Sequence, residues 1–241
     1  IRKEFGDVPT IRYGGSYAKC TMVSTSYDLD VLCYFPRDAS DPGETLKAVF
    51  ESVKTALETE YVVDPKRTAL RISEKQGESL HIDVVPGRFV DDSKTEVFLH
   101  QNEGEKAYLK TNPDTHISHV VESGVRDAIR LAKIWRDRMA VSEAKTFVLD
   151  LLVIKLLEDN KEDTLDDQFK LLLETFRDHS DILTVEDPAN GNNDLSSLID
   201  KMREPVRAAA DSTLKAIEES GWESVFGSTN DDQKSRDEIV R

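Results

Sequence analysis

The chain has 241 residues, 38% of them hydrophobic and 33% charged, which is typical of a soluble globular protein with a sizeable core. Its formal net charge of −15 argues against binding of long nucleic acids, whose phosphates repel an acidic surface, but it allows small nucleotides. No apolar run approaches the roughly 18–20 residues of a membrane span. Cys20 and Cys33 are too few for a disulfide framework, so we expect a reducing, cytoplasmic setting without membrane association.

The first half of the chain alternates strand signals with one long helix. Helical spacing of apolar residues predicts a helix at about residues 44–60. Strands are expected at residues 10–13, 29–35, 61–63, 69–72 and 80–85, with a hairpin turn at residues 76–78. This alternation is typical of an α+β fold.

The pattern becomes helical after about residue 110. Helices are expected at residues 116–139, at residues 145–158, around residues 165–176, and from residue 198 to about 217 with a kink at Pro205. Trp135 lies on the apolar face of the first of these, which favours a place in the core. The tail from Ser228 is polar and is expected to fray. We therefore expect two domains, at residues 1–110 and 111–241.

A Gly-Ser pair and two carboxylates carry the first chemical signal. Gly15-Ser16 forms a turn of the kind that lets backbone N–H groups approach a phosphate. Asp28 and Asp30 are separated by one apolar residue, so in a strand both side chains lie on the same face. Carboxylates held side by side repel each other unless a divalent cation neutralises them. The pattern indicates chemistry on a nucleoside triphosphate with Mg²⁺.

A third carboxylate, Asp83, lies within an apolar strand. An aspartate there is costly unless it is paired or binds a metal. If this strand lies beside the strand of Asp28 and Asp30, three carboxylates meet at one edge, as a two-metal site requires.

These motifs resemble the nucleotidyltransferase superfamily of the DNA polymerase β type. Residues 15–19 (Gly-Ser-Tyr-Ala-Lys) and 27–31 (Tyr-Asp-Leu-Asp-Val) are most similar to the bacterial CD-NTases, the cyclic-oligonucleotide synthases related to cyclic GMP-AMP synthase. Three later stretches also resemble this family: residues 128–136, residues 145–147, and residues 185–188 with the asparagines that follow. The resemblance implies an α+β lobe, with a mixed sheet and flanking helices, packed on a C-terminal helical lobe, and an active site in the cleft between them.

The resemblance also implies roles for individual residues. Asp28, Asp30 and Asp83 would be catalytic and would bind Mg²⁺, or Mn²⁺, with Asp83 also able to accept the proton of the attacking hydroxyl. The implied nucleotide-binding residues are Gly15, Ser16, Lys19, Lys133, Thr146, Phe147, Asp187 and Asn192. The implied activity joins nucleoside triphosphates into a cyclic di- or oligonucleotide messenger and releases pyrophosphate. The resemblance also implies a role in anti-phage signalling and allows a regulatory protein partner.

Two other functions are compatible with these residues. One is template-independent addition to an RNA 3′ end, as in CCA-adding or oligoadenylate-type enzymes, against which the acidic charge weighs. The other is a nucleotide-binding regulatory module without turnover, which three retained carboxylates disfavour.

Several residues also have simpler structural interpretations. Arg126, Arg130 and Lys133 form a helical stripe typical of a solvated face, and Phe147 begins a buried helix. Asn192 and Asn193 fit a turn, and His81 fits either a neighbour of the site or a hydrogen-bonded core position. No metal site is expected at His116 and His119, which lie one helical turn apart without acidic partners. Cys20 departs from the resemblance, because relatives commonly have glycine there.

Overall fold

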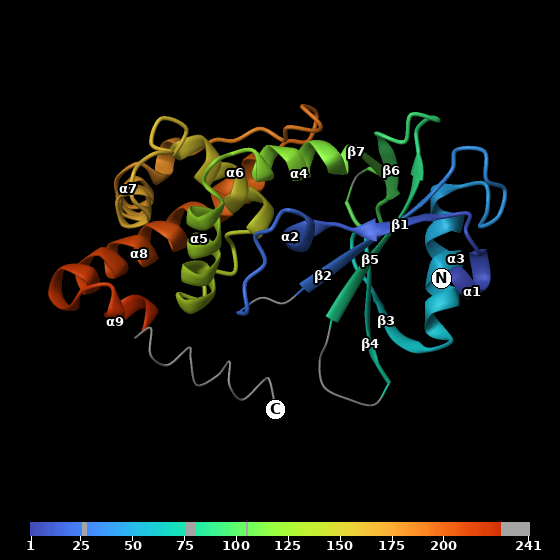
Figure 1. Cartoon of the computed structure of the whole chain (residues 1–241), viewed down its shortest axis with the longest axis horizontal. Helices are drawn as coiled ribbons and strands as arrows, with labels where there is room; N and C mark the ends of the chain where they lie inside the picture. The colour runs from blue at the N-terminus through green and yellow to red at the C-terminus, as the bar shows by residue number, and fades with distance from the viewer. Residues whose placement is uncertain (26–27, 76–80, 105, 228–241) are drawn as a thin grey trace. The chain divides into compact units, whose positions relative to one another are not determined.

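The computed structural model describes residues 1–25, 28–75, 81–104 and 106–227 (Figure 1). The chain forms two compact units: Ile1–Gly124 with Asp187–Asn193, and Val125–Glu186 with Asp194–Arg241. The first unit thus extends past the division near residue 110 that the sequence suggests. The hairpin turn expected at residues 76–78 and the tail expected from Ser228 lie outside the described residues.

The first unit is built on a mixed sheet in the order β1-β2-β5-β4-β3, with β6 pairing to β5 and β7 pairing to β6. Its helices are α1 (Arg2–Phe5), α2 (Gly15–Ala18), α3 (Leu46–Glu58) and α4 (Pro113–Val121). Its strands are β1 (Thr10–Tyr13), β2 (Asp28–Phe35), β3 (Tyr61–Pro65), β4 (Leu70–Glu74), β5 (His81–Phe89), β6 (Val97–His100) and β7 (Tyr108–Thr111). The pair of β2 and β5 is parallel, and the other pairs are antiparallel.

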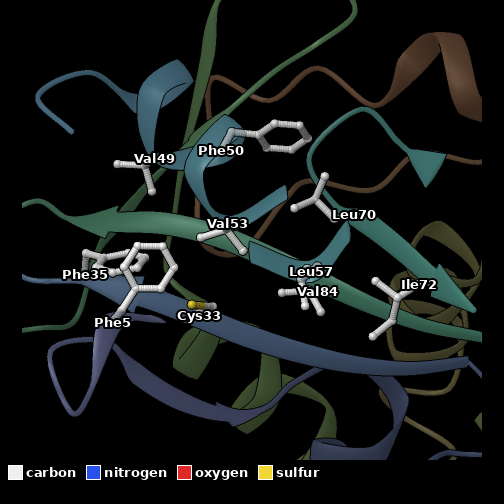
Figure 2. Close-up of a cluster of buried hydrophobic side chains, with 10 residues drawn as sticks. All are labelled: Phe5, Cys33, Phe35, Val49, Phe50, Val53, Leu57, Leu70, Ile72 and Val84. Carbon is white, nitrogen blue, oxygen red and sulfur yellow. The ribbon is translucent and has the colours of Figure 1, made fainter. Parts of the chain in front are cut away.

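Helix α3 covers one face of this sheet. It begins after Thr45, whose hydroxyl accepts a hydrogen bond from the backbone N–H of Ala48 at 3.1 Å, a typical N-cap. Its apolar side packs on residues of β2, β4 and β5, and Figure 2 shows these side chains together. The members of this cluster are Phe5, Cys33, Phe35, Val49, Phe50, Val53, Leu57, Leu70, Ile72 and Val84.

The opposite face of the sheet has its own apolar cluster, formed by Leu32, Tyr34, Phe89, Val97 and Leu99. Side chains alternate along β2, so Cys33 and Phe35 face α3 while Leu32 and Tyr34 face away from it. By the same alternation, the even-numbered Asp28 and Asp30 lie on the face of Leu32 and Tyr34.

The sequence did not predict β6 and β7. Each has four residues, and neither shows a run of strand-forming residues long enough to distinguish it from a loop. Their pairing with β5 and with each other supplies the structure that local composition does not indicate.

The second unit is helical. Its elements are α5 (Arg126–Arg138), α6 (Thr146–Leu156), α7 (Leu165–Asp178), the 3-10 helix η1 (Ser180–Ile182), α8 (Ser196–Ser220) and α9 (Glu223–Phe226). The prediction of a single helix at residues 116–139 is wrong, because α4 ends at Val121 and Gly124, with φ of +81°, separates it from α5. Helix α8 is continuous across Pro205.

Trp135 belongs to the core of this unit, as predicted. Its side chain is fully buried against Phe169 and Phe176, and its Nε1 donates a hydrogen bond to Thr213 Oγ1 at 2.9 Å. Within the described part of the chain, none of the helices combines the length and apolar character that crossing a membrane requires.

Candidate active site

The three candidate carboxylates lie on two neighbouring strands. In the parallel pairing of β2 and β5, Asp30 lies beside Asp83 and Asp28 lies beside His81. Residues in register on adjacent strands project to the same face, so Asp28, Asp30 and Asp83 share one face of the sheet. The strand of Asp83 therefore does lie beside the strand of Asp28 and Asp30, which the sequence analysis gave only as a condition.

Asp30 is the most perturbed of these carboxylates. Burial raises its pKa from 3.8 to about 6, and repulsion from Asp83 and Asp28 adds to the rise, while Lys19 and Arg71 oppose it. The negative charge at this position is therefore only partly compensated by the surrounding cationic side chains. A bound cation would stabilise the ionised form of this group.

The loop before α2 approaches Asp30 very closely. The backbone N–H of Gly14 donates to the carbonyl oxygen of Asp30 at 2.9 Å, which ties the loop to β2. Gly15 has a left-handed φ of +51°, and a Cβ atom there would lie 1.6 Å from Asp30 Oδ2. Only glycine therefore lets the backbone beside Ser16 come this near to the carboxylate.

The end of α2 explains why glycine would suit position 20. Cys20 has a φ of +56°, in the left-handed region that side chains rarely adopt, and it is exposed. Lys19, just before it, is buried, and its charge lowers the pKa of Asp30. The departure from the resemblance at Cys20 thus changes backbone strain in the loop and no candidate metal ligand.

The third carboxylate, Asp83, forms an ion pair with an arginine that the sequence analysis did not single out. Arg71 lies opposite Asp83 in the antiparallel pairing of β4 and β5. Its Nε donates to Asp83 Oδ1 and its Nη2 to Asp83 Oδ2, both at 2.8 Å. Nη2 also lies 3.7 Å from Asp28 Oδ2. The hydrogen bonds to Asp83 raise the pKa of Arg71 despite its partial burial.

The donor chemistry of these residues fits a divalent cation. Carboxylate oxygens are the ligands that Mg²⁺ and Mn²⁺ prefer, and the raised pKa of Asp30 indicates a site that lacks positive charge. Arg71, however, already pairs with Asp83 and lies near Asp28. Among the described residues, no three histidine, cysteine or acidic side chains are grouped so that they could hold a metal ion.

The candidate residues of the helical unit differ in exposure. Thr146 begins α6 and is exposed, whereas Phe147 is half-buried. Lys133 is buried, and its Nζ lies 3.0 Å from Asp150 Oδ1, so it does not lie on the solvated face that its stripe suggested. Arg130, on that stripe, is exposed.

The segment Asp187–Asn193 folds onto the first unit. Buried Asp187 accepts hydrogen bonds from the backbone N–H of Ala189 at 2.9 Å and from Asn193 Nδ2 at 2.7 Å. Asn190 Nδ2 donates to the carbonyl oxygen of Lys110 at 3.0 Å, and its Oδ1 accepts from the backbone N–H of the exposed Asn192 at 3.1 Å. These bonds form a turn, so the turn interpretation accounts for the geometry of Asn192 and Asn193.

The expectation that His116 has no acidic partner is wrong. His116 Nε2 lies 3.4 Å from Asp187 Oδ1 and 3.2 Å from the hydroxyl of Thr111. Burial lowers the pKa of His116, and the charge of Asp187 opposes this change. His81, the other histidine considered, has a buried Nδ1 without a hydrogen-bond partner among the described residues.

The match to a known protein family lies within the first compact unit. Residues 2–123 match the family model described as the Second Messenger Oligonucleotide or Dinucleotide Synthetase domain. Curated protein sequences give no match to the chain.

Solved structures of three bacterial proteins share the fold. CdnC of Escherichia coli MS115-1, in complex with HORMA-deltaN, is 19% identical with a TM-score of 0.67, covering 94% of this chain and 85% of that one. DncV cyclic AMP-GMP synthase of Vibrio cholerae, with nonhydrolyzable GTP, is 19% identical with a TM-score of 0.66, covering 94% and 70%. CdnE cyclic dinucleotide synthase of Elizabethkingia meningoseptica, with GTP and Apcpp, is 14% identical with a TM-score of 0.56, covering 90% and 87%.

At these identities the structural likeness establishes the fold, which is that of the polymerase β-like nucleotidyltransferases, with a mixed sheet, flanking helices and a C-terminal helical region. The family match covers about half of the chain and includes all three carboxylates and the Gly15-Ser16 loop. The chain therefore belongs to the family of second messenger oligonucleotide or dinucleotide synthetases, and it is a nucleotidyltransferase.

Proposed function

We propose that this enzyme joins nucleoside triphosphates into a cyclic di- or oligonucleotide and releases pyrophosphate in a reaction that depends on Mg²⁺. One observation carries the proposal: Asp28, Asp30 and Asp83 share one face of two adjacent parallel strands, and the Gly15 backbone touches this group. A divalent cation bound there would polarise the triphosphate and make the attacking hydroxyl more acidic.

Each residue of the first unit has a distinct proposed task. Asp28 and Asp30 would hold the divalent cations. Asp83 would help to hold the cation on the side of the attacking hydroxyl and could accept the proton of that hydroxyl. The backbone N–H of Gly15 and the hydroxyl of Ser16 donate to the β and γ phosphates, and Lys19 contributes positive charge near Asp30. The steric limit at Gly15 supports this assignment, because it keeps the phosphate-binding backbone close to the carboxylates.

The residues of the second unit and of the turn remain proposed nucleotide contacts. The exposed hydroxyl of Thr146 suits a phosphate oxygen, and the half-buried ring of Phe147 suits stacking on a base. Lys133 can serve a phosphate only while it also neutralises Asp150. Asp187 is held within its turn and beside His116, so we propose that it orients this segment, with Asn192 as the exposed polar side chain.

The proposed setting is cytoplasmic anti-phage signalling, with nucleoside triphosphates as substrates and Mn²⁺ able to replace Mg²⁺. The complex of CdnC with HORMA-deltaN supports a regulatory protein partner for this chain as well. We propose residues 1–110 as the catalytic domain and residues 111–241 as the helical, nucleotide-binding domain.

The test is product analysis. The purified enzyme is incubated with radiolabelled nucleoside triphosphates in all combinations with Mg²⁺ or Mn²⁺, treated with phosphatase, and analysed by chromatography and mass spectrometry. We expect a phosphatase-resistant product with the mass of a cyclic di- or oligonucleotide. Asp30→Asn should abolish it, whereas Asp38→Asn, which removes an exposed carboxylate just beyond β2, should not.

Two results would contradict the proposal. One is the absence of any phosphatase-resistant product in every nucleotide mixture. The other is extension of a tRNA primer in place of a cyclic product, which would identify the enzyme as an RNA 3′-end transferase.

A further inference from the structure

Arg71 makes the most specific contact with the proposed metal-binding carboxylates. We propose that its guanidinium acts as a built-in counter-ion that holds Asp83 when no divalent cation is bound and competes with the cation for that carboxylate. This inference rests on the proposed function, since it assumes that Asp83 is a metal ligand.

The geometry of the contact is that of a strong, oriented ion pair. Both oxygens of Asp83 accept hydrogen bonds from one guanidinium, at 2.8 Å each. Such a two-pronged contact fixes the plane of the carboxylate as well as neutralising it. Because Arg71 and Asp83 are paired directly across β4 and β5, the contact requires no unusual backbone conformation.

The position of Arg71 also matches the local excess of negative charge. Its Nη2 lies 3.7 Å from Asp28 Oδ2, so one guanidinium touches two of the three carboxylates. Its charge lowers the pKa of Asp30, the third. Arg71 therefore already provides part of the electrostatic stabilisation that a divalent cation would provide.

This contact explains why the three carboxylates, although on one face, do not form a metal-binding group among the described residues. With both oxygens of Asp83 engaged, a cation must share or displace the guanidinium to use this ligand. The side chain of Arg71 is 30% exposed, which gives it access to water when it is displaced. A partly exposed pair of this kind contributes little to global stability, so its main effect should be local.

The experiment measures Mn²⁺ binding without nucleotide, by the electron paramagnetic resonance signal of free Mn²⁺. Arg71→Gln removes the competing charge, and we expect its Kd for Mn²⁺ to be about tenfold lower than that of wild type, as loss of one charge-assisted contact implies. Arg71→Lys keeps the positive charge but cannot make both hydrogen bonds to Asp83, so its Kd for Mn²⁺ should lie between those of wild type and Arg71→Gln. Arg37→Gln, which removes an exposed arginine from the same unit, controls for net charge and should resemble wild type.

Asp83→Asn identifies the ligand for which Arg71 and the cation compete. In that background, Arg71→Gln should tighten Mn²⁺ binding by much less, because only the weaker effect of its charge on Asp28 and Asp30 remains. Thermal unfolding in EDTA checks that each variant folds, and the Tm of Arg71→Gln should be close to that of Arg37→Gln.

The outcomes separate this inference from the proposed function. Unchanged or weaker Mn²⁺ binding in Arg71→Gln, with binding still lost in Asp30→Asn, overturns the competition and leaves the metal site intact. A gain of the same size in the Asp83→Asn background also overturns it. If wild type binds no Mn²⁺ at all, the metal site and the inference both fall.

Discussion

Replacement of Gly15 by alanine tests how closely the Gly15-Ser16 loop and the carboxylates are coupled. The added Cβ would lie 1.6 Å from Asp30 Oδ2 and 2.6 Å from its Cγ. An ordinary carbon–oxygen contact is about 3.3 Å or more, so the carboxylate or the loop must move by roughly 1.5–2 Å. Misplacing a catalytic group by about 1 Å can lower turnover about 100-fold, and we expect at least this loss. The left-handed φ of +51° adds about 1–2 kcal/mol of destabilisation for alanine.

The assay is pyrophosphate release at saturating nucleotide and Mg²⁺, combined with thermal unfolding followed by circular dichroism. Gly6→Ala is the matched control, because Gly6 also has a left-handed φ, of +56°, but no atom within 4 Å of the added Cβ. We expect Gly6→Ala to lose stability and keep turnover. Wild-type turnover in Gly15→Ala, or an equal loss in Gly6→Ala, would refute the steric coupling to Asp30.

Three further predictions concern stability. Burial is the main cause that raises the pKa of Asp30 from 3.8 to about 6. In EDTA, as the pH rises through this window, the free energy of unfolding of wild type should therefore fall by about 2–3 kcal/mol relative to that of Asp30→Asn, and it should stay lower above the window. The same difference in unfolding free energy between wild type and variant in denaturant curves at pH 4 and pH 8 would contradict this. Lys133→Met leaves Asp150 as a buried carboxylate without its lysine and should cost about 3 kcal/mol in urea unfolding, part of it regained with Asp150→Asn; wild-type stability would rule out a stabilising pair. Thr213→Val leaves the buried indole N–H of Trp135 without an acceptor and should cost about 1–3 kcal/mol, whereas Thr213→Ser should be milder; equal losses in the two variants would count against the hydrogen bond.

Much of the fold followed from local patterns. The period of α3 gave its buried face, since Val49, Phe50, Val53 and Leu57 all lie in the core. The helical character of the second half and the core position of Trp135 were also visible in the sequence. The break between α4 and α5 was not, because the apolar spacing continues across Gly124 while its left-handed backbone ends the register.

The sequence by itself determined which groups the chain offers for chemistry and on which face of a strand they lie. Gly15-Ser16 and the alternation of Asp28 and Asp30 are local properties, set by the absence of a Cβ atom and by the two-residue period of a strand. They were sufficient to indicate the family.

Only the tertiary structure decided what each group touches. Arg71 holds Asp83 because β4 and β5 are antiparallel in one particular register, and His116 meets Asp187 although they are far apart in the chain. Lys133 is buried beside Asp150 because α5 and α6 pack together, whereas its own helix suggested an exposed stripe. Periodicity reports the face on which a side chain lies, but the partner on that face, and hence its charge and pKa, depends on strand register and helix packing between distant segments.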